Sequence, residues 1–198
     1  MQDYIHLHVH TQYSLLDGQA SIPKLVDKAI ADGMRGMAIT DHGNMMGVKE
    51  LFDYCNDTNK KRKKEGLEPF KPIFGCEVYV ARRRKEDKTD PKLDRGGNHL
   101  ILLAKNFHGY QNLTELVSRA WVDGFYGHPR TDHDDLVRYH EDLICCSACI
   151  AGEVQGVLDA GGAHDGDVLV HGDDLAEDEE EEQLIKTGGE VAEDHGAD

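Results

Sequence analysis

Two patterns of apolar residues follow each other in turn along the first 160 residues. One is the short apolar run typical of a buried strand, and the other is the three-and-four spacing typical of an amphipathic helix. Short apolar runs predict strands at 4–9, 36–40, 72–81, 99–104 and 143–149. Apolar positions three and four apart predict helices between Ser21, a possible cap, and Gly33, and at 48–64, 110–122, 134–140 and 153–160. This alternation favours an α/β fold with a largely parallel sheet, and a barrel would suit it.

For the helix predicted at 48–64, the sequence also predicts which side chains point toward the protein interior. Its apolar spacing predicts that Leu51, Phe52 and Cys55 turn inward. The basic run Lys60–Lys64 falls at its C-terminal end, where positive charge suits the helix dipole.

The composition changes abruptly near Gly161-Gly162. Residues 163–198 carry 14 Asp and Glu and one Lys, a net charge of −13, whereas residues 1–162 carry a net charge of −3. An unbroken acidic run such as Glu177–Glu182 is typical of a solvated or disordered segment. The sequence therefore predicts one domain over 1–162. An acidic, glycine-rich tail follows over 163–198, either disordered or an atypical end of the fold.

Hydropathy and cysteine content exclude several classes of protein. No apolar run approaches the about 20 residues that span a bilayer. The start, Met1–Tyr4, lacks the basic and apolar regions of a secretory signal. A cytoplasmic location without a membrane partner is expected. Five cysteines, an odd number, argue against a disulfide framework, and the Cys146-x-x-Cys149 spacing alone is weak evidence for a metal or redox motif.

Two basic clusters, Lys60–Lys64 and Arg82–Lys85, could approach a phosphate backbone. Each is explained at least as well as a solvated helix end or a solvated loop. The acidic tail would repel phosphates, so charge alone does not predict nucleic-acid binding.

Three histidines, His6, His8 and His10, alternate along the first predicted strand. A period of two would point all three to one face, and neutral imidazole is the commonest metal ligand in proteins. Asp17 follows shortly after, where a carboxylate could join or bridge metal ions. Packing explains such a cluster poorly, so it predicts a metal site.

Four more candidate ligands lie at or near the ends of other predicted strands. His42 follows the second strand, His99 opens the fourth and Cys149 closes the fifth. Glu77 lies inside the apolar third strand, where an unpaired buried charge would be costly, although a solvent-facing position is the alternative. Because catalytic side chains of barrels gather at the C-terminal ends of strands, we expect these residues to meet at one edge.

The mixture of candidate ligands narrows the choice of metal and reaction. Nitrogen, oxygen and thiolate ligands suit Zn, Mn or Fe better than Mg or Ca. So many ligands imply more than one ion, and paired metals are the usual device for hydrolysing phosphate esters with a metal-bound water. The sequence contains no P-loop or GxGxxG motif.

Taken in order, these residues resemble the metal motifs of a known family. The motifs of the PHP (polymerase and histidinol phosphatase) family are similar to His8-Val9-His10-Thr11, Thr40-Asp41-His42-Gly43, Gly75-Cys76-Glu77, Asn98-His99-Leu100 and Cys149. Segments 13–18, 113–127 and 143–154 resemble the branch of this family found in bacterial DNA polymerase III alpha subunits. The resemblance covers residues 3–160.

The resemblance implies a distorted (βα)7-type TIM-like barrel with a trinuclear metal centre at its C-terminal face. The implied ligands of two or three divalent ions (Zn, Mn or Fe) are His8, His10, Asp17, His42, Glu77, His99 and Cys149, with His6 outside the ligand shell. The implied activity is phosphoester hydrolysis, as 3′–5′ exonuclease proofreading at a DNA 3′ end, by a metal-bound water that Asp17 and His10 assist. The implied partners are the rest of the polymerase alpha subunit and other replisome subunits.

The chain departs from the family's pattern at its C-terminal end. The family closes its motif set with an Asp-x-His pair. None occurs after residue 150, where the nearby candidates are His164, Asp165, Asp167 and His171. Two ligands and the last barrel strands are therefore unaccounted for, and polymerase palm, fingers and thumb segments are absent. A catalytically silent platform within the polymerase and a free-standing phosphatase of the histidinol phosphate type stay open as alternatives.

Overall fold

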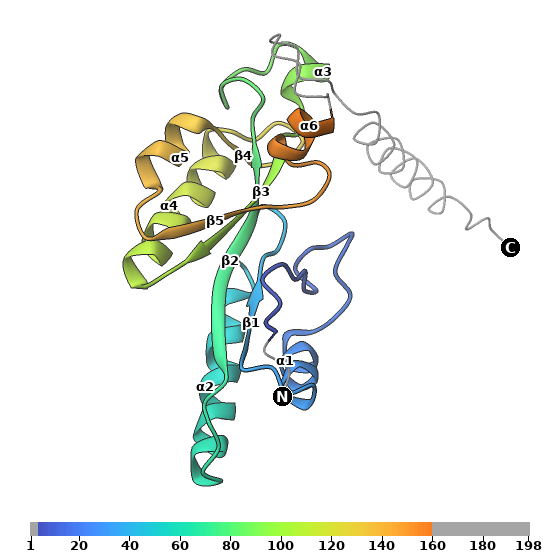
Figure 1. Cartoon of the computed structure of the whole chain (residues 1–198). Coiled ribbons are helices and arrows are strands. Elements are labelled where there is room, and N and C mark those ends of the chain that lie inside the picture. The colour runs from blue at the N-terminus through green and yellow to red at the C-terminus, as the bar shows by residue number, and fades with distance from the viewer. Residues whose placement is uncertain (1–3, 160–198) are drawn as a thin grey trace, which may run out of the picture. The chain divides into compact units, whose positions relative to one another are not determined.

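A computed structural model of the chain describes residues 4–159, in which helices and strands alternate (Figure 1). The helices are α1 (Ile22–Ala31), α2 (Val48–Lys64), α3 (Pro91–Asp94), α4 (Phe107–Val122), α5 (His133–Tyr139) and α6 (Glu153–Asp159). The strands are β1 (Gly36–Ile39), β2 (Lys71–Val80), β3 (Asn98–Ala104), β4 (Arg130–Thr131) and β5 (Leu143–Ser147). The predicted acidic tail, 163–198, lies outside the described residues.

The five predicted helices are confirmed, and α3 adds one turn inside the stretch expected to be a loop. Ser21 is the residue before α1, as predicted, but its side chain makes no capping hydrogen bond. In α2, Leu51 and Cys55 are buried, whereas Phe52 is 47% exposed, so the prediction that Phe52 faces inward was wrong. No helix within residues 4–159 is both long enough and apolar enough to cross a bilayer.

The first predicted strand, 4–9, does not form a regular strand. The segment runs beside β1 through two backbone hydrogen bonds. Ala38 N–H donates to His6 O at 2.9 Å, and Thr40 N–H donates to Val9 O at 2.8 Å. The acceptors are three residues apart and the donors only two. One extra residue therefore interrupts the ladder, as at a β-bulge.

The strands form a mixed sheet, which corrects the prediction of a largely parallel one. Strands β1 and β4 run parallel to β2, whereas β3 is antiparallel to β2 and β5 is antiparallel to β3. The connection between β2 and β3 gives the reason. A parallel neighbour needs a crossover, usually a helix, but residues 81–97 hold only the four-residue α3.

The sheet is open within residues 4–159. Its order is β1-β2-β3-β5, with β4 beside β2, and no pairing joins β1 to β5 in this part of the chain. The closed (βα)7 barrel that the resemblance implies is therefore not shown, and its closure stays a prediction.

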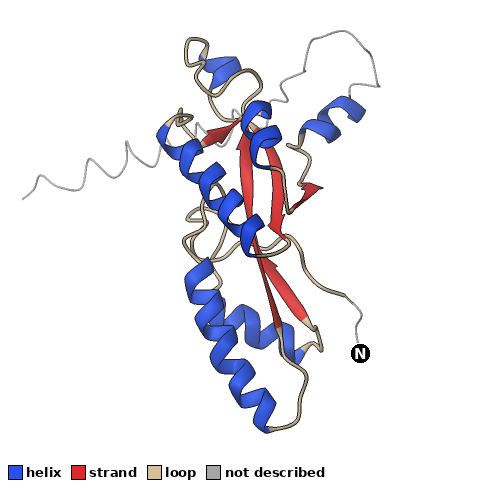
Figure 2. Cartoon of the chain, turned by 90° about the vertical axis from the view of Figure 1, so that its left-hand side faces the viewer, coloured by secondary structure: helices blue, strands red, loops and turns tan. Residues whose placement is uncertain are grey.

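Two clusters of buried apolar side chains hold the helices against the sheet. The first joins α1 and α2 to β1 and contains Ile22, Val26 and Leu51. The second joins α4 to β2 and β3 and contains Leu113 and Leu116. Figure 2 shows α4 in front of the upper part of the sheet. The apolar stripes that helical spacing predicts are therefore the faces that are buried.

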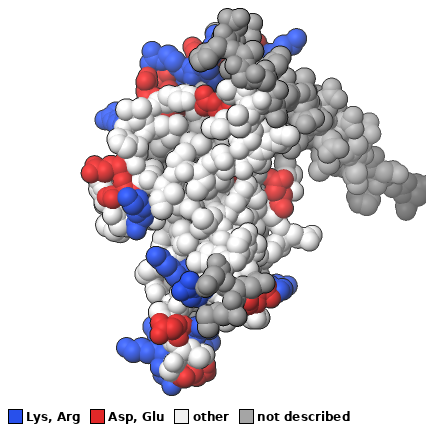
Figure 3. All heavy atoms as spheres, viewed as in Figure 1, with Lys and Arg blue, Asp and Glu red and all other residues white. Residues whose placement is uncertain are grey.

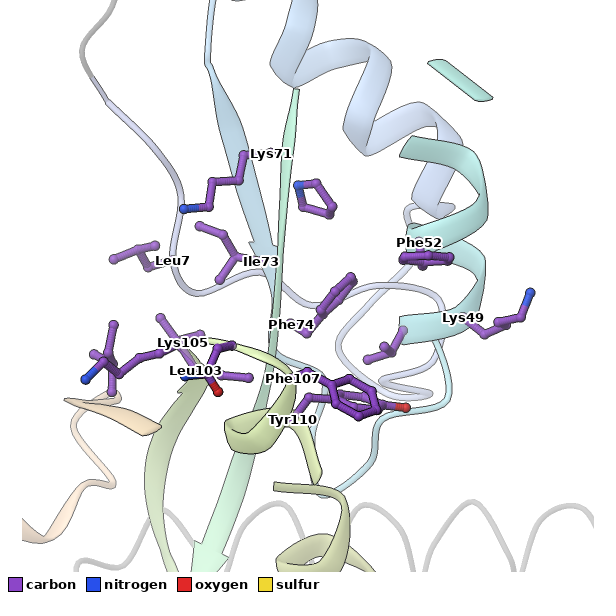
Figure 4. A pocket seen from close by; sticks show the side chains of 15 residues that line it. Leu7, Lys49, Phe52, Lys71, Ile73, Phe74, Leu103, Lys105, Phe107 and Tyr110 are labelled. Atoms are coloured by element: carbon purple, nitrogen blue, oxygen red, sulfur yellow. The ribbon is translucent and has the colours of Figure 1, made fainter. Parts of the chain in front are cut away.

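An apolar groove of about 660 Å³ lies beside the N-terminal half of β2 and the last residues of β3 (Figure 4). Phe52, Phe74 and Phe107 line it, which explains why Phe52 is not enclosed by the core. The candidate ligand Glu77 is not among the lining residues and follows Phe74 by three residues in the C-terminal half of β2.

A buried arginine ties together the loops that follow β2 and α4. Arg130 is 0% exposed, and its guanidinium donates to the carbonyl oxygens of Gly124 (2.9 Å), Lys85 (2.6 Å), Asp87 (3.0 Å) and Asp94. One planar fork thus satisfies several carbonyl groups that no regular strand or helix pairs.

Charged side chains of both signs are mixed on the face shown in Figure 3. The basic run Lys60–Lys64 ends α2, where Lys60 pairs with Asp57 at 2.7 Å. In the second basic cluster, Arg83 pairs with Asp94 at 2.6 Å. Part of each cluster is thus neutralised within the chain, so neither one alone indicates a phosphate-binding surface.

Candidate metal centre

Glu77 stands at the centre of the candidate site, and the alternation of side chains along β2 puts it there. Cys76, Val78 and Val80 are buried in the cluster that contains α4. Because successive side chains of a strand point to opposite faces, Glu77 projects from the other face. Its side chain is 1% exposed. The carboxylate is therefore buried and paired, and the alternative of a solvent-facing position is excluded.

Four imidazoles surround this carboxylate. Glu77 Oε2 lies 2.8 Å from His8 Nε2 and 2.9 Å from His10 Nε2. Glu77 Oε1 lies 3.0 Å from His99 Nδ1, and His42 Nδ1 is 3.7 Å from Oε2. The histidines come from the first segment, the loop after β1 and the start of β3, so they meet only in the folded chain.

The imidazole rings also pack against one another and against a tyrosine. His10 stacks on His42 with ring centroids 4.3 Å apart, and His42 meets His99 edge-on at 5.2 Å. Tyr79 stacks on His42 at 5.6 Å and meets His99 edge-on at 5.1 Å. The sequence interpretation missed Tyr79, although a period of two along β2 places it on the same face as Glu77.

Asp17 and Cys149 each contact one of these histidines. Asp17 Oδ2 lies 2.9 Å from His42 Nε2, and the Asp17 side chain is 54% exposed. Cys149 Sγ lies 3.4 Å from His99 Nδ1. Cys149 follows β5 by two residues, which corrects the prediction that it closes the strand. The structure thus brings all seven predicted ligands into one neighbourhood.

His6 stays apart from this cluster. Its ring meets that of Tyr4 edge-on at 4.8 Å, whereas His8 Nε2 and His10 Nε2 lie 3.0 Å from each other. The interrupted ladder between His6 and Val9 explains the difference, because a bulge re-aims side chains on either side of it. The prediction that all three histidines share one face was therefore wrong for His6.

Burial and hydrogen bonds set the charges of the site. Burial alone would raise the pKa of Glu77, but hydrogen bonds with His10 and His99 hold that pKa well below its usual range. The hydrogen bond with Glu77 raises the pKa of His10. Burial lowers the pKa of His42 to about 4. The His42 imidazole is therefore neutral at pH 7, the form that binds metal ions.

The nitrogen and oxygen atoms of these side chains lie close enough together to bind metal ions. Two sets of three donors, each within 4.8 Å of one another, share Glu77: His8 and His10 complete one set, and His42 and His99 the other. Among the described residues, His42 Nδ1 is buried and has no hydrogen-bond partner. An unpaired buried polar atom is costly, so this nitrogen is suited to bind a cation.

A buried carboxylate, Asp41, supports the segment that carries His10. It accepts hydrogen bonds from the backbone N–H of Thr11 at 2.6 Å and from the hydroxyls of Thr11 and Ser14 at 2.8 Å each. The sequence interpretation assigned a role to His42 but none to Asp41 or Ser14. The place of Asp41 beside His42 is a signal that could have found it, whereas no pattern in the sequence marks Ser14.

A buried carboxylate on a strand of a mixed sheet, with four histidines around it, defines the class of this protein, an α/β domain with a candidate metal centre. The family model described as the PHP domain matches residues 6–189. The chain therefore belongs to the PHP domain family, as the resemblance of its motifs predicts.

The curated relatives narrow this match to the PHP region of bacterial DNA polymerase III alpha subunits. The chain is 46% identical over 155 residues to the DNA polymerase III subunit alpha of Borreliella burgdorferi, covering 78% of this chain and 13% of that protein. It is 42% identical over 176 residues to the subunit of the same name from Chlamydia trachomatis, covering 88% of this chain and 13% of that protein. The chain thus spans about an eighth of the length of these relatives.

One solved structure is similar to the chain at a lower sequence identity. A candidate metal-dependent phosphoesterase from Bifidobacterium adolescentis is 20% identical, with 59% of this chain and 32% of that chain covered and a TM-score of 0.33. A likeness at this level carries no argument about the site.

Proposed function

We propose that this chain is the PHP domain of a bacterial DNA polymerase III alpha subunit and that it hydrolyses phosphoesters with bound divalent metal ions. The observation that carries the proposal is the convergence of four imidazoles, from His8, His10, His42 and His99, on the carboxylate of Glu77. In the polymerase branch of the family, the activity would be 3′–5′ exonuclease proofreading at the 3′ end of a DNA strand.

The proposed centre holds two or three ions of Zn, Mn or Fe. Its proposed ligands are His8, His10, Asp17, His42, Glu77, His99 and Cys149. Glu77 supports more than one ion because it belongs to both donor sets. Imidazole, carboxylate and thiolate together suit these metals better than Mg or Ca.

Metal ions, when bound, lower the pKa of water and offset the negative charge of a phosphate. The chain's own groups would hold the reactants. The half-exposed carboxylate of Asp17 would accept the proton of the attacking water. His10, held 2.9 Å from Glu77, would help to orient that water.

The same proposal places the domain in the cytoplasm, with DNA as substrate and the rest of the alpha subunit and other replisome subunits as partners. Closure of the sheet into a (βα)7 barrel belongs to it as well. No polymerase activity is expected from these 198 residues alone.

The test is digestion of single-stranded DNA labelled at its 3′ end, with Mn²⁺ or Zn²⁺ added to the purified chain. We expect release of the terminal nucleotide and its loss in His10→Ala, because that imidazole contacts Glu77. His6→Ala is the matched control, since it removes a histidine of the same segment whose ring lies against Tyr4. Loss in both variants contradicts the assigned role of His10, and no cleavage by the unaltered chain with metal bound contradicts the nuclease.

A silent platform within the polymerase is the second candidate. Residues 151–198 contain no Asp-x-His pair, so these residues do not supply two of the ligands that the resemblance implies. Metal found by elemental analysis without any turnover would support this candidate. Rapid hydrolysis of small phosphomonoesters but not of DNA would instead favour a phosphatase of the histidinol phosphate type.

A further inference from the structure

One buried hydroxyl, that of Ser14, contacts two of the proposed ligands at once. Ser14 is 3% exposed, and its Oγ has three polar neighbours. Asp41 Oδ1 lies 2.8 Å away, His10 Nδ1 lies 3.1 Å away, and the backbone nitrogen of His42 lies 3.1 Å away. The two histidines belong to segments about 30 residues apart in the sequence, so Ser14 links them through space.

The direction of each hydrogen bond follows from counting protons. An ionised carboxylate can only accept, so the single Ser14 hydroxyl proton goes to Asp41. The Thr11 hydroxyl also donates to Asp41 while accepting the N–H of Tyr13 at 3.2 Å, which leaves Asp41 as the acceptor of both hydroxyls. The lone pairs of Ser14 Oγ then accept from the N–H of His42 and from Nδ1–H of His10.

We propose that Ser14, held by Asp41, is a positioning residue that keeps the proton of His10 on Nδ1 and thereby turns the lone pair of Nε2 toward the metal centre. The same hydroxyl holds the backbone of His42, so one side chain sets the positions of two ligands. Partners of this kind fix the tautomer and ring orientation of metal-bound histidines. The inference rests on the proposed metal centre but not on nuclease activity.

Thr11 offers a matched comparison for a purely structural role. Its hydroxyl donates to the same carboxylate at the same distance, 2.8 Å, and Thr11 is likewise buried, yet this hydroxyl makes no hydrogen bond with an imidazole of residues 4–159. Removing either hydroxyl takes one hydrogen bond from Asp41. Only removal of the Ser14 hydroxyl also frees His10.

The experiment compares Ser14→Ala with Thr11→Val in the full chain. Zn²⁺ affinity, measured by titration against a competing chelator, is expected to fall about 10–100-fold in Ser14→Ala. In Thr11→Val it should stay within about threefold of the unaltered chain, and both metal-free variants should unfold at similar urea concentrations. Nitrogen NMR of the zinc-bound chain should show His10 protonated at Nδ1, with that proton signal lost or exchange-broadened in Ser14→Ala.

Two results would overturn the role of Ser14. One is an equal loss of zinc affinity in both variants, and the other is a zinc-bound His10 that carries its proton on Nε2. Failure of the proposed function looks different. A chain that binds zinc with the expected pattern but does not cut DNA contradicts the nuclease alone and supports the positioning role.

Discussion

At the scale of single residues, the main feature of the site is a charged group that is buried. Moving an ionised carboxylate such as that of Glu77 out of water costs several kcal/mol unless partners replace the lost hydration. His8, His10 and His99 lie within 2.8–3.0 Å of it, and hydrogen bonds with His10 and His99 keep its pKa low. His42 shows the opposite case, because burial favours its neutral form. The same pocket thus keeps an anion charged and an imidazole neutral, which is the combination a cation needs.

His42 should make the metal-free protein less stable as the pH falls. Its pKa in the folded chain is about 4, below its ordinary value of 6.5, so the unfolded chain binds the proton first. The free energy of unfolding therefore has its full value above pH 6.5, where His42 is neutral in both the folded and the unfolded chain. It decreases as the pH falls from 6.5 toward 4. Urea unfolding in the presence of chelator should show this dependence, and His42→Gln should show a weaker one. Parallel pH curves for the two proteins would contradict the assignment.

At the scale of elements, β2 organises both the sheet and the site. Its first half pairs with β1 through Lys71–Phe74, and its second half pairs with β3 through 75–80. Alternation along the second half sends Cys76 and Val78 toward α4 and Glu77 toward the histidines. A shift of one residue in this register would exchange the two faces, so the apolar packing of α4 also fixes the position of Glu77.

Arg130 is expected to matter for stability rather than for metal binding. Arg130→Lys keeps the charge but loses the planar fork, so carbonyls of the 85–94 loop and of Gly124 lose their donors. Buried acceptors left without partners predict a loss of about 3 kcal/mol or more in the free energy of unfolding. Urea unfolding measures it, with Arg138→Lys as the control because Arg138 is exposed on α5. A change under about 0.5 kcal/mol, the range of ordinary surface substitutions, would contradict the role of Arg130.

Helix positions were predictable from the sequence because their signals are local. The stripe of Leu113 and Leu116 in α4 depends only on spacing within one helix, and it is buried as predicted. Strand pairing depends on residues far apart, so the antiparallel pairing of β3 and the two-residue β4 were not predicted. The irregular 4–9 segment failed as a strand prediction because one extra residue in its ladder leaves no mark in the apolar pattern.

At the scale of the whole molecule, the site exists only when several distant segments are in place. His8 and His10 precede β1, Glu77 lies in β2 and His99 is the second residue of β3. The unfolded chain holds no such arrangement, so ions that bind the folded site add their binding free energy to folding.

Removal of metal should therefore lower the stability of the whole domain. If the free zinc concentration is 100 times the dissociation constant, removal of zinc by a chelator is expected to lower the free energy of unfolding by about 2.7 kcal/mol. Thermal unfolding with and without chelator measures this, after elemental analysis has shown that metal is bound. Glu77→Gln, which removes the carboxylate common to both donor sets, should show little response to chelator. An equal response in both proteins would contradict binding at this site.

The sequence by itself determined the chemical identity of the candidate ligands, the helices and the family, because residue types, local periodicity and ordered motifs are properties of the chain as written. Only the tertiary structure decided that four imidazoles surround Glu77 and that Ser14 and Asp41 form a hydrogen-bonded pair next to His10. The physical reason is that burial, proton direction and side-chain facing are set by neighbours from other segments. A bulge and a mixed sheet place those neighbours in ways that no local pattern records.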